Sequence, residues 1–154
     1  MVKKWLQENT KEYSKAIINL LKAEVSAQKI SDYFYLGLIY RSFSDIYNNA
    51  YNSVESLNYA QKAYEYFQLS GYTNYADWAL WDIGKAFHNS TDYNSSIEIA
   101  QKVVNIASVK QDTLLLSDGL RLLATSYVAK KDYILAQRYY NRIRELDNNL
   151  LTID

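Results

Sequence analysis

The sequence predicts an all-α protein, a right-handed α-α superhelix (solenoid) of antiparallel helix hairpins with about seven helices. The first observation is a fixed period of 40 residues, which places Gly84 in register with Ser44 and Ala124. The second is apolar residues at spacings of three and four, and the third is the absence of proline. Self-similarity at a fixed period is typical of repeat proteins, and helices without proline run unkinked. Three further phases of the period agree: Ile83 with Phe43 and Leu123, Phe87 with Tyr47 and Tyr127, and Asp92 with Asn52 and Asp132.

The composition excludes several classes of function. The chain has 154 residues, with 17 lysines and arginines against 17 aspartates and glutamates, and no block of basic residues. This argues against a dedicated nucleic-acid surface, whose affinity comes from neutralising phosphates. There is no cysteine for a disulfide or a thiolate site. No apolar run reaches the ~18–20 residues of a membrane span, so we expect a cytoplasmic location, or an extracytoplasmic one if a leader has been removed.

The first two helices are expected over residues 11–29 and 32–50. Thr10 is a candidate N-cap for the first, and Ser31 for the second, because short hydroxyl side chains accept hydrogen bonds from the first turn. Each helix carries one apolar stripe at helical spacing. The stripes comprise Tyr13, Ala16, Ile17, Leu20, Leu21 and Ala23 on the first, and Phe34, Leu36, Ile39, Tyr40, Phe43 and Tyr47 on the second.

Cap residues at a common phase open the later helices. Asn52 and Glu55 form a pair like a capping box ahead of a helix over 53–70, which ends at Gly71. Helices should then run from Thr73 to about Asn89, from Asp92 to about Lys110, from Asp112 to about Lys130 and from Asp132 to about Asp147. Glu98 and Lys102, four residues apart, add an ion pair on the outside of the 92–110 helix.

The period divides the chain into one array. A partial repeat over 1–30 precedes repeats over 31–70, 71–110 and 111–154, and no linker separates them. Each repeat is a hairpin of helices A and B, and stacked hairpins bury a continuous core. Where A and B cross, small residues let the backbones approach. They are Ser44, Gly84 and Ala124 on A, and Ala16, Ser56, Ser96 and Ala136 on B.

These residues carry a resemblance. Residues 111–148 match the family pattern best, through Leu123, Ala124, Tyr127, Asp132, Tyr133, Ala136, Tyr140 and Ile143. Residues 71–110 match through Gly84, Phe87, Tyr93, Ser96 and Ala100, and residues 31–70 match more loosely. The chain thus resembles the tetratricopeptide repeat (TPR) family, in a variant whose unit is 40 residues instead of about 34 and lacks the usual closing proline.

The resemblance implies a protein–protein or peptide-binding scaffold that uses the concave face of the A helices. The partner would be a protein or an extended peptide. The stripe on that face is expected to comprise Leu38, Arg41, Asp45, Asn48, Asn49, Trp78, Trp81, Lys85, His88, Asn89, Asp118, Arg121, Thr125 and Val128. The alternative is a sensor or regulatory TPR segment of a bacterial signalling or transcription-regulating protein, with its output domain outside this chain.

Two interpretations stay open for the stripe. Arg41 and Arg121 share one phase with Trp81 between them, which favours a clamp for an acidic side chain or a C-terminal carboxylate. The tryptophans can equally fill the gap between neighbouring A helices, with the polar residues forming a solvated face. His88 is the single histidine, so no metal cluster is expected, and we expect it to lie on the surface.

No enzyme, cofactor or metal site is expected. The serines lack a nucleophile-elbow pattern, and the four glycines form no phosphate loop. The last residues are apolar without a following A helix, namely Leu146, Leu150, Leu151 and Ile153. They indicate either an excerpt of a longer array or self-association through this end.

Overall fold

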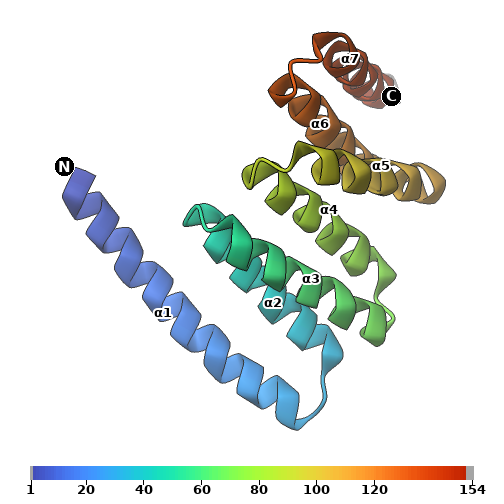
Figure 1. Ribbon diagram of the computed structural model, residues 1–154. Coiled ribbons are helices and arrows are strands. Elements are labelled where there is room, and N and C mark those ends of the chain that lie inside the picture. Colours follow the sequence, from blue (N-terminus) through green and yellow to red (C-terminus); the bar gives the residue numbers. More distant parts are fainter. Residues whose placement is uncertain (1, 152–154) are drawn as a thin grey trace. The chain divides into compact units, whose positions relative to one another are not determined.

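A computed structural model describes residues 2–151, with side chains described for residues 12–148. Seven α-helices and no strand occur within residues 2–151 (Figure 1). They are α1 (Val2–Lys29), α2 (Tyr33–Asn49), α3 (Ser53–Ser70), α4 (Thr73–Asn89), α5 (Tyr93–Lys110), α6 (Thr113–Ala129) and α7 (Tyr133–Leu151). The chain forms two compact units, Met1–Ala76 and Asp77–Asp154, whose boundary falls inside α4. The single array over 1–154 stays a prediction.

Every connection between helices is built around one residue in the left-handed conformation, and these residues recur every 20 positions. Their φ angles lie between 53° and 75°. The residues are Ser31, Tyr51, Gly71, Thr91, Gln111 and Lys131. The 40-residue period of the sequence therefore contains two turns of the same geometry, one after each helix.

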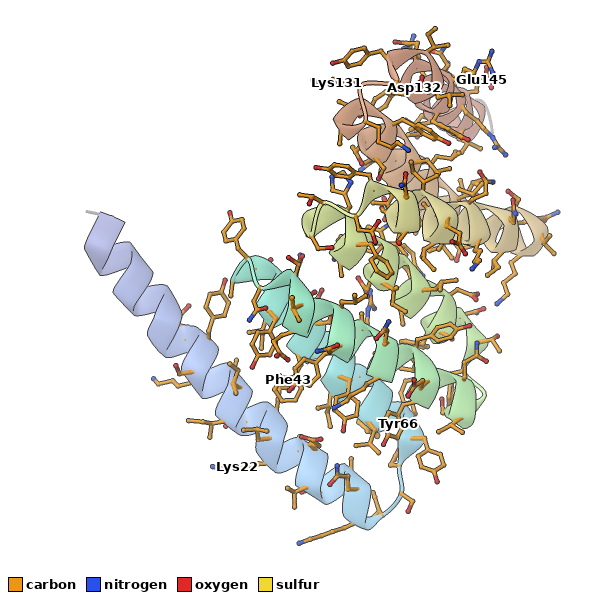
Figure 2. The ribbon with its side chains drawn as sticks, in the orientation of Figure 1. Lys22, Phe43, Tyr66, Lys131, Asp132 and Glu145 are labelled. Atoms are coloured by element: carbon orange, nitrogen blue, oxygen red, sulfur yellow. The ribbon has the colours of Figure 1, made fainter. Side chains whose placement is uncertain are left out.

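The residue after the left-handed position joins two helices at once. At Asp132, the backbone N–H donates to Tyr127 O at 2.9 Å and closes α6, while Oδ1 accepts from Leu135 N at 3.1 Å and opens α7. Figure 2 labels Lys131 and Asp132 at this turn. A left-handed residue followed by an N-cap is thus a complete connection between two helices. Asn52, Asp92 and Asp112 cap in the same way, which confirms these predicted caps, and Gly71 ends α3 as predicted.

Two predicted caps are wrong. Thr10 lies inside α1, which already begins at Val2. Ser31 takes the left-handed position itself with φ 53°, and Asp32 caps α2 by accepting from Tyr35 N at 3.1 Å. A helix cap needs extended backbone, which Ser31 does not have. The predicted ends also shift slightly, because α6 stops at Ala129 and α7 runs on to Leu151.

In the first unit, α2 and α3 cross at the predicted small residues. Ser44 and Ser56 are both buried, and Ser44 Oγ donates to Ser56 O at 2.9 Å. Beside this crossing, the rings of Tyr47 and Tyr59 stack with centroids 5.4 Å apart and planes 6° from parallel. The small side chains therefore permit close backbones, and the aromatic pair fills the space next to them.

The second unit repeats this packing. A Cβ atom added at Gly84 would lie 2.9 Å from Leu122 Cδ2 and 3.1 Å from Ile99 Cγ2, so α4 approaches both α5 and α6 closely. Tyr127 and Tyr139, 80 residues after the first aromatic pair, stack at 5.6 Å and 11°. Two positions of the period thus make the same contact in both units.

Candidate functional site

The predicted stripe divides between the two units. Arg41, Asp45, Asn48 and Asn49 lie on α2 in the first unit, where Asp45 and Asn49 are exposed and the other two are partly buried. Leu38 lies on α2 as well, and the remaining residues lie on α4 and α6 in the second unit. Because a clamp that joins Arg41 to Trp81 and Arg121 would span both units, it stays a prediction. The second unit alone gives a site whose geometry is defined.

Trp81 links α4 to α6, and Trp78 packs against it on α4. Trp81 is partly buried, and its Nε1 donates to Asp118 O at 3.3 Å. Its ring packs against the core cluster that contains Leu120 and Leu123. Trp78 meets it edge to face, with ring centroids 5.9 Å apart. Trp81 therefore fills the space between α4 and α6, as one of the two open interpretations expected. Trp78 is the outer member of the Trp78–Trp81 pair.

Lys85 lies over the Trp81 ring, beside a buried carboxylate. Its Nζ lies 4.5 Å from the Trp81 ring centroid and 3.2 Å from Asp82 Oδ1. Asp82 is 2% exposed, whereas the Lys85 side chain is 27% exposed. A buried carboxylate is costly unless a cation stands beside it, so the lysine has a structural role. Its ammonium still reaches the surface, where it can meet a negative group.

His88 points into the unit and does not lie open on its surface, contrary to our expectation. Its Nδ1 lies 2.9 Å from Ser126 Oγ, and Ser126 Oγ lies 3.1 Å from Ser96 Oγ. Both serines are fully buried, and the Tyr93 ring stands edge-on to the imidazole at 5.3 Å. Burial lowers the pKa of His88 below its usual value, since the charged imidazolium loses hydration. The chain of three polar groups ties α4, α5 and α6 together.

The α6 residues are the most accessible part of the site. The Arg121 side chain is 61% exposed, and its Nη1 lies 3.9 Å from Asp118 Oδ1. Thr125 Oγ1 donates within its own helix, at 3.0 Å to Arg121 O and 3.1 Å to Leu122 O. Its hydroxyl hydrogen is therefore used inside the helix, and Arg121 is the group on α6 best placed to reach a ligand.

We call the surface formed by Trp78, Trp81, Lys85, Asp118 and Arg121 the α4–α6 face. It presents two cations and one carboxylate around an aromatic edge, and Asn89 lies exposed at the last turn of α4. Such a surface can hold an apolar side chain against the indoles and pair a negative group with a cation. The described residues contain no group of three or more His, Cys, Asp or Glu that could hold a metal ion. Among the helices described, none is long and apolar enough to cross a membrane.

No protein-family model matches the sequence, and no curated protein matches it either. Solved structures do match. The crystal structure of the apo form of RapI superposes on 99% of this chain with a TM-score of 0.81 and 18% sequence identity. The chain spans 56% of the RapI chain. At this identity the match shows a shared fold, and with the seven helices it confirms the predicted all-α fold of helix hairpins.

Sequence reasoning missed two residues of the site. Ser126 lies at the same position of the 40-residue period as Ile46 and Ala86, which are apolar. A hydroxyl at this position was the feature of the sequence that could have indicated a polar contact. Asp82 lies one residue after Trp81 on the inward side, and only its burial reveals that Lys85 balances it. Both depend on contacts between helices, which the period alone does not specify.

Proposed function

We propose that this chain is a protein- or peptide-binding segment, without enzymatic activity, whose partner contacts the α4–α6 face. The observation that carries the proposal is Arg121, which is 61% exposed and is paired with Asp118, whose backbone carbonyl accepts from Trp81 Nε1. An exposed guanidinium beside an aromatic edge is the composition found at interface hot spots. A preformed helical surface also lowers the ordering cost that an extended peptide meets on binding.

The repeats themselves are best described as a long-unit TPR variant. The support is that left-handed turns recur every 20 residues and that the Tyr47–Tyr59 contact recurs at Tyr127–Tyr139. Without a proline to close helix B, each helix keeps its full 17 or 18 residues from α2 to α6. On this proposal the A helices of the second unit, α4 and α6, form the ligand-binding side.

The ligand that suits the α4–α6 face carries a carboxylate next to an apolar side chain. Arg121 is paired with Asp118 only at 3.9 Å, so a closer carboxylate can compete for the guanidinium. Lys85 adds a second positive charge beside the indole. These charges are near the surface, and we expect binding to weaken as salt is added.

A second candidate is a regulatory segment whose output domain lies elsewhere in a longer protein. The observation in its favour is that the matching fold in RapI is part of a chain of which this one spans 56%. In this case peptide binding would alter a neighbouring domain, and the α4–α6 face would be the sensing surface.

Selection from a display library of random linear peptides tests the proposal. Enriched peptides are synthesised, and their affinities are measured for the wild type, Trp78→Ala, Arg121→Ala and a control, Arg138→Ala, on the exposed side of α7. We expect about a tenfold loss or more for the first two variants and none for the control. Unchanged affinity in both face variants would refute the proposed site.

Trp81→Ala separates the two interpretations of that residue. Because its ring packs against the core and its Nε1 reaches α6, we expect the variant to melt at a lower temperature. If peptide affinity is unchanged in the remaining folded protein, Trp81 acts only as packing. A parallel loss of affinity at a temperature where the variant is folded would assign it to the binding surface.

A further inference from the structure

The outer side of α1 carries a row of apolar side chains that the rest of the first unit does not cover. Ile18, Leu21 and Val25 are 53%, 47% and 52% exposed, and with Lys22 they line a shallow hollow. Their spacing of three and four residues places them on one side of the helix. The opposite side packs on α2, where Tyr40 donates to Glu24 Oε1 at 2.6 Å and Ala27 is buried. Figure 2 shows Lys22 pointing away from α2 and α3.

The other helices of the same phase provide an internal control for this row. At the positions of Ile18, Leu21 and Val25, the helices α3, α5 and α7 carry only polar or charged residues, all of them exposed. They are Asn58, Gln61 and Glu65 on α3, Glu98, Gln101 and Asn105 on α5, and Arg138, Asn141 and Glu145 on α7. The repeat architecture therefore does not require apolar residues here. Since exposed apolar rows are disfavoured unless they are used, the row on α1 indicates a binding partner.

Positive charge lines one border of the row. Lys15, Lys22 and Lys29 are exposed and follow one another at intervals of seven residues, so they form a line along the side of the row away from α2. An apolar row at spacings of three and four with charges beside it is the pattern that receives an amphipathic helix. The sign of the charges selects a partner with negative charges opposite the lysines.

We propose that the α1 row, comprising Ile18, Leu21 and Val25, binds an amphipathic helix of a partner protein whose apolar side is bordered by glutamate or aspartate. A second copy of this chain fits less well. Antiparallel pairing through the same row would place two lysine lines against each other, and parallel pairing would use the side of α1 that α2 occupies. An anionic membrane is also less suitable, because three aliphatic side chains in a hollow present no broad apolar face with aromatic anchors.

Synthetic helical peptides with leucine at matching spacing provide the probes. The acidic probe has glutamate beside the leucines, the basic probe has lysine there, and a scrambled probe keeps the acidic composition without the row. Fluorescence anisotropy measures their affinity for the full chain. A row variant replaces the apolar residues with those that α3 carries at the same phase, Ile18→Asn, Leu21→Gln and Val25→Glu, and a charge variant combines Lys15→Glu, Lys22→Glu and Lys29→Glu. Lys102→Glu on α5, at the phase of Lys22, is the control.

The expected result is that the acidic probe binds about tenfold or more tightly than the basic and scrambled probes, and that the row variant loses this binding. The charge variant should prefer the basic probe, and the control should behave as the wild type. If the row variant does not fold, the proposal is tested by the charge variant alone, which should bind the basic probe more tightly than the acidic probe. Equal binding of all probes, or unchanged affinity in the folded variants, would overturn the proposal. Two other results would also overturn the proposal. One is dimerisation in light scattering that the row variant abolishes. The other is binding to anionic vesicles that the row variant abolishes, with no binding of the acidic probe.

Discussion

Substituting Gly84 tests the packing that holds the second unit together. Gly84 lies on α4 where α5 and α6 both approach, and even a Cβ atom there would lie 2.9 Å from Leu122 Cδ2 and 3.1 Å from Ile99 Cγ2. Gly84→Leu adds three more carbon atoms beyond that point. Leu122 is 7% exposed, so it has little open space into which to move. We therefore expect the larger side chain to push the helices apart.

The expected loss follows from two opposing effects. Overpacking of a well-filled core costs up to about 3 kcal/mol, and leucine favours a helix interior over glycine by about 1 kcal/mol. At the upper end of that cost the net loss is about 2 kcal/mol, which in a chain of this size corresponds to a fall in Tm of about 4–8 °C. Gly84→Ala should change stability by less than about 1 kcal/mol, because its single methyl group meets the end of a flexible side chain.

Thermal unfolding followed by circular dichroism at the helical signal measures this difference. Gln101→Leu, at an exposed position of α5, controls for the effect of adding a leucine to a helix. We expect it to stay within about 0.5 kcal/mol of the wild type. A Gly84→Leu protein that melts at or above the wild-type temperature would show that the three helices do not meet at this position.

Three further measurements test other parts of the account. The pKa of His88 is lowered in the folded protein, so the unfolded chain binds its proton more readily, and the contribution of His88 to stability should be full above pH 6.5 and fall as the pH drops below it. A pH series of urea melts should therefore show a flatter dependence of stability on pH for His88→Gln than for the wild type, and equal slopes in the two proteins would contradict the assignment. Lys85→Ala should cost about 1–3 kcal/mol because it removes a cation that lies 3.2 Å from a buried carboxylate. Lys102→Ala breaks an exposed pair at 2.8 Å and should cost less than about 0.5 kcal/mol, so similar losses of the two variants in denaturant unfolding would be inconsistent with the burial of Asp82. Thr91→Gly should raise Tm by relieving a left-handed threonine at φ 66°, a gain of about 0.5–1 kcal/mol, and a lower Tm would show that the turn is not strained.

The sequence was sufficient to predict the helices because their signals are local and repeated. Asn52, Asp92 and Asp132 share a phase and a side-chain chemistry, and the structure uses each as an N-cap. Ser31 resembles a cap in the sequence, because a hydroxyl residue one position early cannot be distinguished from an N-cap when the backbone conformation is unknown. Its φ of 53° belongs to the end of the preceding helix. A 20-residue register, which the structure makes plain, would have pointed to Asp32.

The candidate site was harder to predict, since its contacts join residues far apart in the chain. Phase placed Trp81 and Arg121 on A helices, but it did not reveal that Trp81 donates to Asp118 O across the gap. It also could not show that His88 turns toward Ser126, 38 residues further on. Periodicity assigns a residue to a side of its helix, whereas the partner across the interface depends on side-chain volumes in both helices.

The most direct test is an NMR titration of the chain with a library-selected peptide, observing the indole and guanidinium N–H signals. If the α4–α6 face binds the partner, the signals of Trp78 and Arg121 should shift with peptide concentration and saturate together, while the signal of Arg138 stays fixed. Saturating shifts confined to other residues, with Trp78 and Arg121 unmoved, would contradict the account.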